Sequence, residues 1–289
     1  MPELPEVETL RRSLEPHLVG RTVAAATLHR RDIAVAPGDP PGGFARQRTP
    51  ARPRRLARDQ MLAGAVIAGL ERRGKQLAII ATDGRAIRVH LGMSGQLLRA
   101  ARAGRLPGDH VHATWRLDDG GRLVFRDPRR FGGLWLVDAG GERFDAALGP
   151  DALAIGAAEL RAALDGARRP IKAALLDQRV LAGVGNIYAD ESLFAARIHP
   201  RAIAAALDPP RISALAAAIR RTLASAVRAR GSSIRDYRDP SGEPGGFQAR
   251  HRVYGRAGLA CHGCGRMLAS DLVAQRTTVW CPGCQGTDY

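Results

Sequence analysis

Residues 77–91 read LAIIATDGRAIRVHL, a pattern in which two apolar runs flank a Thr-Asp-Gly turn at 82–84. Apolar runs separated by an Asp-Gly pair are a sequence signature of a β-hairpin. A second hairpin pattern follows at 115–125, where WRL and RLVF flank the turn at 118–121. Several such hairpins within 22–138 favour a β-sandwich over a parallel α/β sheet.

Helical patterns lie on both sides of this β-rich region. Residues 4–18 keep Val7, Leu10, Leu14 and Leu18 on one face, with acidic residues in the first turn, where the helix dipole favours them. The middle third of the chain has four further helical patterns, and the last begins at Asp208 with two prolines as cap and first turn. These patterns predict helices at 158–164, 170–182, 187–196 and 209–230.

The chain of 289 residues is long enough for two or three domains. The change from hairpins to helices, and then to a Gly/Ser/Pro-rich loop, predicts domains at 1–140, 146–231 and 232–289. The fold class is therefore α+β and multidomain. A stretch rich in Pro, Gly and Arg at 36–58 is expected to form a mobile, basic insertion in the first domain.

Composition limits the classes of function. The chain is 45% apolar and 25% charged, and it has neither a membrane-length apolar run nor the basic start of a signal peptide. We therefore expect a cytoplasmic, globular protein. The formal net charge is +16 and the pI is about 11.2, which favours a polyanionic partner such as nucleic acid.

The four cysteines form two pairs, Cys261 with Cys264 and Cys281 with Cys284, and sixteen residues separate the pairs. Two CxxC pairs at such a spacing are typical of a tetrahedral four-thiolate zinc site. The alternative is a pair of disulfides or a redox CxxC, which a reducing cytosol disfavours. The pattern predicts one structural Zn²⁺ in a finger at about 253–286.

The first residues offer a nucleophile. Removal of Met1 would leave Pro2 as a free secondary amine, which can attack an electrophilic carbon and form a cationic iminium. Glu3 beside it is suited to proton transfer. The alternative is that these residues only begin a helix whose dipole favours acidic side chains.

Three further motifs favour DNA contact. Residues 183–188, GVGNIY, place glycines before a helix whose free amides can hold a phosphate, although an ordinary helix hairpin carries the same pattern. The loops HLGMSG at 90–95 and DPRRFG at 127–132 each display a large side chain beside glycine. Such side chains suit wedges that enter a base stack, whereas Met or Phe next to a strand is otherwise a core residue.

Together these motifs resemble the formamidopyrimidine-DNA glycosylase family over nearly the whole chain. The resemblance rests on MPELPEVET at 1–9, HLGMSG, DPRRFG, GVGNIYADESLF at 183–194 and the four-cysteine segment. It implies an N-terminal β-sandwich, a helix–two-turn–helix DNA-binding domain and a C-terminal zinc finger. It also implies a glycosylase and abasic-site lyase that removes oxidised purines, such as 8-oxoguanine and formamidopyrimidines, from double-stranded DNA in base excision repair. The sequence gives no sign of an obligate protein partner, so we expect a monomer.

The resemblance implies a role for each site residue. After the damaged nucleotide is flipped out of the duplex, the Pro2 nitrogen attacks C1′ and expels the base, while Glu3 protonates the sugar oxygen. Lys75 donates a proton during β-elimination, and Arg276 acts in the δ-elimination that follows. Met93, Arg129 and Phe131 fill the gap left by the flipped nucleotide. Two further DNA contacts are implied in the helical domain, at Lys172 and Asn186.

The chain departs from the family pattern at two positions. Gly108 stands where the family usually has a DNA-contacting histidine, and Ala167 stands where a basic residue is frequent. Two other functions remain open at this point. One is the related endonuclease VIII branch, which prefers oxidised pyrimidines, and the other is a non-catalytic protein that binds damaged DNA.

Overall fold

The structure is a computed structural model that describes residues 2–37, 61–101, 104, 108–233 and 243–286. Most of the expected insertion at 36–58 lies outside the described residues. The chain divides into two compact units. Unit 1 comprises Met1–Pro2, Glu6–Ala146 and Ser232–Gly245, and unit 2 comprises Glu3–Pro5, Ala147–Gly231 and Gly246–Tyr289.

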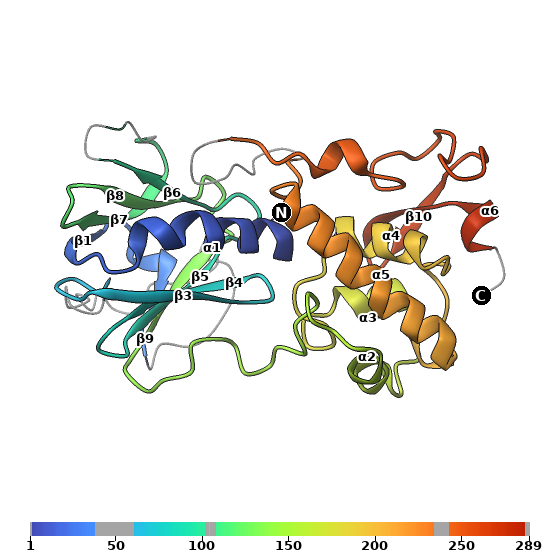
Figure 1. The fold of residues 1–289 in the computed structure, drawn as a ribbon, viewed down its shortest axis with the longest axis horizontal. Helices are drawn as coiled ribbons and strands as arrows, with labels where there is room; N and C mark the ends of the chain where they lie inside the picture. The colour runs from blue at the N-terminus through green and yellow to red at the C-terminus, as the bar shows by residue number, and fades with distance from the viewer. Residues whose placement is uncertain (1, 38–60, 102–103, 105–107, 234–242, 287–289) are drawn as a thin grey trace. The chain divides into compact units, whose positions relative to one another are not determined.

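Unit 1 is a β-sandwich with an N-terminal helix, as the hairpin patterns predict (Figure 1). One sheet has the strand order β1-β7-β8-β6 and the other β2-β9-β5-β4-β3. All neighbouring strands are antiparallel except β2 and β9. The elements are α1 (Leu4–Leu18), β1 (Val23–Leu28), β2 (Ala34–Val35), β3 (Ile67–Arg73), β4 (Gln76–Ala81), β5 (Ala86–His90), β6 (Gln96–Ala100), β7 (Val111–Leu117), β8 (Arg122–Arg126) and β9 (Gly133–Val137).

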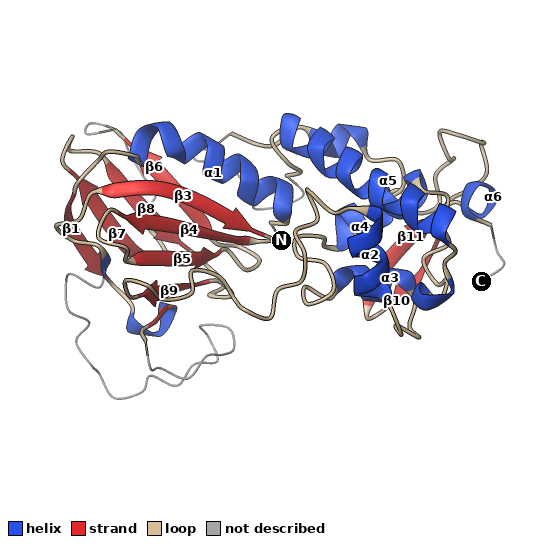
Figure 2. Ribbon diagram, turned by 60° about the horizontal axis from the view of Figure 1, so that its bottom comes forward, coloured by secondary structure: helices blue, strands red, loops and turns tan. Residues whose placement is uncertain are grey.

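The two sheets and α1 share one apolar core. The face of α1 that carries Val7, Leu10, Leu14 and Leu18 packs into the same cluster as residues of both sheets. Figure 2 shows α1 running along the strands of unit 1. Because each sheet alone has one apolar face, burial of both faces against each other and against the helix stabilises the unit.

The hairpin that the sequence predicts at 77–91 is confirmed. Strands β4 and β5 pair in antiparallel register with Ile79 opposite Ile87. Gly84 has a φ of +87°, a backbone conformation that glycine adopts without strain. The second hairpin is confirmed as β7 and β8, where Trp115 lies opposite Leu123.

The part of unit 2 from Ala147 to Gly231 contains the helices α2 (Ala157–Leu164), α3 (Ile171–Leu176), α4 (Asn186–Ala195) and α5 (Pro209–Arg228). Their buried residues form one core, which includes Leu4 from the start of the chain. The predicted cap of α5 is confirmed, since the Asp208 side chain accepts a hydrogen bond from Arg211 N at 2.8 Å. Within the described residues, no helix is both long and apolar enough to cross a membrane.

The predicted helix at 170–182 is wrong in its length, because α3 ends at Leu176. Asp177 leaves the helix, and its carboxylate accepts a hydrogen bond from Arg179 N at 3.0 Å. Gln178 bonds the backbone of the next turn, accepting from Gly183 N at 2.9 Å and donating to Val184 O at 2.9 Å. These side chains satisfy backbone groups outside a helix and so compete with its continuation.

The C-terminal part of unit 2 contains a two-stranded hairpin, β10 (Ala269–Val273) and β11 (Arg276–Trp280), followed by the short helix α6 (Pro282–Gln285). The hairpin turn consists of Ala274 and Gln275, with φ values of 50° and 58°. Positive φ at both central residues matches the twist of a two-residue hairpin, but neither residue is a glycine or an asparagine.

Candidate active site and nucleic-acid interface

Glu3 is buried at the start of α1, and the N-terminus of α4 holds its carboxylate. Oε2 accepts a hydrogen bond from Gly185 N at 2.6 Å, and Oε1 accepts one from Ile187 N at 2.9 Å. The positive end of the α4 dipole also favours a carboxylate here. The amides of Gly185 and Ile187, which the sequence analysis offers to a DNA phosphate, are thus bonded to Glu3 in this structure.

Glycines allow this close approach. A Cβ on Gly185 would lie 2.4 Å from Glu3 Cδ. Gly183 has a φ of +115°, and a Cβ there would lie 2.4 Å from Leu4 Cδ1. Leu4 N also donates to Gly183 O at 3.1 Å. The GVGN motif thus accommodates the first turn of α1 rather than forming an ordinary helix hairpin.

Pro2 and Lys75 both belong to unit 1. Pro2 is buried and precedes the first residue of α1 by two positions. Lys75 follows Gly74 in the tight turn between β3 and β4, and its residue surface is only 7% exposed. A lysine held in a turn between two paired strands has a defined backbone position, which suits a group that must deliver a proton.

The loops that carry Met93, Arg129 and Phe131 are joined through Asp127. The buried Asp127 carboxylate accepts hydrogen bonds from Ser94 Oγ at 2.6 Å and from Gly132 N at 2.8 Å. Ser94 Oγ in turn accepts from Arg129 N at 3.2 Å. The sequence reasoning missed Asp127, although an acidic residue just after an apolar strand was a usable signal.

The three side chains on these loops are not equally displayed. Arg129 is exposed, Met93 is half-buried, and Phe131 is only 9% exposed. The Arg129 guanidinium carbon lies 4.7 Å from the centre of the Phe131 ring, a cation–π arrangement. The expectation that the 127–132 loop freely displays Phe131 is thus corrected, because the ring packs beneath Arg129.

Lys172, which the resemblance implies as a DNA contact, is buried inside unit 2 rather than presented at a surface. Its Nζ lies 2.6 Å from Asp190 Oδ1 and donates to Thr278 Oγ1 at 2.8 Å and to Thr277 O at 3.1 Å. Burial lowers the pKa of Lys172 and raises the pKa of Asp190 to about 6.

Asn186 and Arg276 lie beside this cluster. Asn186 Nδ2 donates to Thr277 O at 3.0 Å, so this side chain also contacts the hairpin. Arg276 is exposed as the first residue of β11 and pairs with Val273 across the turn. The structure therefore brings Glu3, Asn186 and the strand that begins with Arg276 to the first turn of α4.

The sequence reasoning also missed Asp190 and Glu191, two adjacent acids in an otherwise apolar helix. The Glu191 carboxylate accepts hydrogen bonds from Val253 N and Tyr254 N, each at 2.9 Å. Two buried acids inside a helix need partners, and that requirement was a signal that could have identified them.

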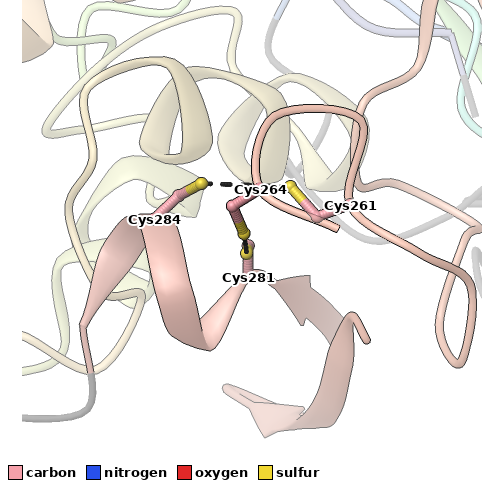
Figure 3. A group of neighbouring side chains, drawn as sticks. All are labelled: Cys261, Cys264, Cys281 and Cys284. Atoms are coloured by element: carbon pink, nitrogen blue, oxygen red, sulfur yellow. Dashed lines mark hydrogen bonds between the residues drawn. The ribbon is translucent and has the colours of Figure 1, made fainter. Parts of the chain in front are cut away.

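The four cysteines converge as their spacing predicts (Figure 3). Their sulfur atoms all lie within 4.8 Å of one another, and all four thiols are free. A tetrahedral zinc–thiolate site with bonds of about 2.3 Å places its sulfurs about 3.8 Å apart. The Cys261–Cys284 and Cys264–Cys281 sulfur distances are 3.9 and 3.3 Å. The group can therefore hold one metal ion.

The two departures from the family pattern are solvent-accessible to different degrees. Gly108 is exposed, and a Cβ there would meet nothing within 4 Å. Ala167 packs partly against the core of unit 2. Its neighbour Arg168 is exposed, whereas Arg169 forms an ion pair with Asp177 at 2.9 Å. Arg168 is thus the basic side chain that this segment offers to solvent.

Family models match most of the chain. The formamidopyrimidine-DNA glycosylase N-terminal domain matches residues 1–134, and the formamidopyrimidine-DNA glycosylase H2TH domain matches residues 148–238. The formamidopyrimidine-DNA glycosylase of Paracoccus denitrificans (strain Pd 1222) is 42% identical, and the alignment covers 99% of this chain and 100% of that protein.

Solved structures show the same similarity. The MutM (Fpg) protein from Thermus thermophilus has a TM-score of 0.82 and 40% identity, with full coverage of both chains. Wild-type Lactococcus lactis Fpg (MutM), in complex with DNA that contains N7-benzyl-Fapy-dG, has a TM-score of 0.81 and 32% identity. That match covers 99% of this chain and 100% of the other. With relatives that match along its whole length, the chain belongs to the formamidopyrimidine-DNA glycosylase family.

Proposed function

We propose that this chain is a bifunctional glycosylase and abasic-site lyase that excises oxidised purines, including formamidopyrimidines, from double-stranded DNA. The observation that carries the proposal is the anchored Glu3 carboxylate, which is covalently next to Pro2 and is held by Gly185 N and Ile187 N. This fixes a proton-transfer group beside a terminal secondary amine. Complexes of relatives with a Fapy-dG derivative and with carbocyclic 8-oxo-G support a purine lesion, and the Lactococcus lactis protein is also found with DNA that contains an oxidised pyrimidine.

The chemistry follows from an N-terminal proline that has lost Met1. The nitrogen lone pair of Pro2 forms a bond to C1′, and the glycosidic bond breaks with its electrons leaving on the base. Bonding to C1′ makes the Pro2 nitrogen cationic, and the Glu3 carboxylate takes its N–H proton and passes it to the sugar ring oxygen. The ring opens, the sugar remains attached to Pro2 as an iminium, and the departing base takes a proton from solvent. The iminium acidifies C2′, so loss of that proton expels the 3′ phosphate in β-elimination.

Two further groups complete the strand cleavage. We assign Lys75 to proton donation in the β step, where a compact amine is suited to moving a proton. We assign Arg276 to the δ step, in which loss of a second proton, from C4′, expels the 5′ phosphate. Water then hydrolyses the remaining imine and releases Pro2.

The flipped nucleotide leaves a gap that costs a few kcal/mol in lost stacking and pairing. We assign Met93 and Phe131 to filling the gap and Arg129 to hydrogen bonding with the orphaned opposite base. The cation–π contact between Arg129 and Phe131 means that these two side chains must separate or move together when DNA binds.

Borohydride trapping on duplexes tests the mechanism, because reduction of the iminium links the protein to DNA covalently. We expect full trapping by the wild type, much lower trapping by Pro2→Gly, and folded but slow base excision by Glu3→Gln. Full trapping by Pro2→Gly would identify another nucleophile. Duplexes with 8-oxoguanine, formamidopyrimidine or an oxidised pyrimidine, tested in parallel, measure lesion preference. Faster release of the pyrimidine would favour the endonuclease VIII branch.

We also propose that the metal held by Cys261, Cys264, Cys281 and Cys284 is one structural Zn²⁺. The chemistry of four thiolates suits zinc, and the sulfur distances fit a tetrahedral site. The metal would supply folding free energy to a segment with a small core of its own. Elemental analysis of active protein should find about one zinc per chain, and active protein without zinc would contradict this.

A further inference from the structure

A buried polar cluster in unit 2 joins helices α3 and α4 to strand β11. Lys172 on α3 lies 2.6 Å from Asp190 on α4, and it donates to Thr278 Oγ1 on β11 at 2.8 Å. The side chains of Lys172 and Asp190 are 0% and 1% exposed. Placing charges in a protein interior costs free energy, and an apolar trio could pack as stably. The cluster therefore calls for an explanation other than stability.

The Lys172–Asp190 pair binds the backbone of β11 at residues 277 and 279. Thr277 O accepts from Lys172 Nζ at 3.1 Å, and Val279 N donates to Asp190 Oδ2 at 3.1 Å. Thr278 Oγ1 itself donates to Arg276 O at 3.0 Å. Two hydrogen bonds, through the Thr278 hydroxyl, thus connect the backbone carbonyl of Arg276 to Lys172, and the strand cannot slide without breaking several bonds.

The hairpin needs this external support. Its turn residues Ala274 and Gln275 both have positive φ, which costs about 1 kcal/mol or more for each residue that is not glycine. Such a turn persists only when the surroundings fix the strands on both sides of it. Since Arg276 comes directly after the turn, any change of turn geometry would redirect its side chain.

We infer that Lys172, Asp190 and Thr278 are positioning residues that aim Arg276 at the sugar during δ-elimination. The inference rests on the proposed function, which assigns Arg276 to that step. The same first turn of α4 that holds the Glu3 carboxylate also bonds Thr277 O through Asn186. The cluster therefore fixes the position of the Arg276 backbone relative to Glu3. A long flexible arginine side chain needs a fixed backbone if it is to act at a defined atom.

The experiment measures β and δ products from a duplex with a preformed abasic site, under single-turnover conditions with enzyme in excess. Thr278→Val keeps the shape of the side chain and removes both of its hydrogen bonds, and Asp190→Asn removes the charge. In each variant we expect borohydride trapping and β-elimination at the wild-type rate, with δ-elimination about tenfold slower. Ser270→Ala, which removes an exposed hydroxyl from the partner strand β10, should leave both rates unchanged.

Arg276→Ala separates failure of this inference from failure of the proposed function. If Arg276→Ala leaves the ratio of δ to β product unchanged, the assignment of Arg276 falls and the positioning role falls with it. If Arg276→Ala removes δ product while Thr278→Val and Asp190→Asn keep the wild-type ratio, the positioning role alone is overturned. An equal loss of both steps in Thr278→Val and in Asp190→Asn would also overturn it, because it would indicate a structural role only.

Discussion

Unit 1 and unit 2 hold their candidate site residues by different physical means. In unit 1, backbones approach so closely that only glycine fits: a Cβ on Gly92 would lie 2.4 Å from the carbonyl carbon of Phe131, and one on Gly132 would lie 2.6 Å from His90 O. One buried carboxylate, that of Asp127, joins the two loops. In unit 2, a buried charge pair, Lys172 with Asp190, holds the strand that presents Arg276.

The difference matters for how each unit tolerates change. A fit between backbones fails gradually, because neighbouring atoms can shift to relieve a clash. Removal of one partner of a buried charge pair causes a large loss of stability, since the other charge then remains in the interior without compensation. We therefore expect the substitution that costs the most free energy of unfolding to be in the charge pair of unit 2. Among substitutions that act through steric clashes, we expect the largest cost in unit 1.

Lys172→Met should destabilise unit 2 by about 3–5 kcal/mol, because it leaves the Asp190 carboxylate buried and unpaired. Native-state hydrogen exchange read by mass spectrometry would measure the two units separately. The double variant Lys172→Met/Asp190→Leu should recover most of the loss, since neither charge remains. If Lys172→Met alone loses less than about 1 kcal/mol of stability, the charge pair is not the most sensitive part of unit 2.

Gly92→Ala should destabilise unit 1 by about 2–4 kcal/mol, from overpacking against Phe131 and from a φ of +60°. Gly64→Ala is the matched control, because Gly64 has a φ of +82° but a Cβ added there would meet nothing within 4 Å. The control should lose only about 1 kcal/mol, the cost of the positive φ. Equal losses at both positions, by hydrogen exchange of unit 1, would mean that close approach contributes nothing.

The sequence predicts local features of this fold well and long-range contacts poorly. Alternating apolar residues and Asp-Gly turns predict the hairpins of unit 1, and the cap at Asp208 predicts α5, because these signals act over a few residues. The early end of α3 depends on hydrogen bonds from Asp177 and Gln178 to a loop. Those bonds leave no mark on the apolar pattern.

The same distinction between short-range signals and long-range contacts applies to the site residues. The spacing of Cys261, Cys264, Cys281 and Cys284 predicts their convergence, since two short knuckles can close on one ion. The sequence could not show that Lys172 is buried, because its carboxylate partner lies on another helix. Nor could it show that Glu3 occupies the amides at the start of α4, because 182 residues separate Glu3 from Gly185.

Ser94→Ala should destabilise unit 1 by about 2 kcal/mol, which is less than the Gly92 change. The Ser94 hydroxyl donates to the Asp127 carboxylate at 2.6 Å, and hydrogen bonds to charged groups contribute about 1.5–3 kcal/mol. Asp127 keeps its bond from Gly132 N, so the loops should loosen without separating. The exposed Ser270→Ala should change stability by less than about 0.5 kcal/mol. Equal losses of stability in Ser94→Ala and Ser270→Ala would show that Ser94 does not help to hold the two loops together.

The smallest expected effect is a pH dependence that differs between the units from pH 7 to pH 5. In unit 1, burial alone would raise the pKa of Glu8, but hydrogen bonds from Arg11, Arg12 and Arg72 outweigh it and lower the pKa to about 2. The stability contributed by Glu8 is present above the unfolded value of 4.5 and is lost only as the pH falls from there toward 2. Glu8 therefore contributes no change to unit 1 between pH 7 and pH 5.

The pKa of Asp190 in unit 2 is shifted in the opposite direction. Burial raises its pKa from 3.8 to about 6, so its favourable contribution is present below 3.8 and is lost as the pH rises through 6. Acidification from pH 7 to pH 5 should then stabilise unit 2 by about 1 kcal/mol relative to Asp190→Asn, whose amide does not titrate. Hydrogen exchange of both proteins at both pH values, corrected for the intrinsic exchange rate, measures this difference. An equal pH response in wild type and Asp190→Asn would mean that the Lys172 charge keeps Asp190 ionised throughout. Asp190 would then resemble Glu8, which its arginine partners keep ionised over the same pH range.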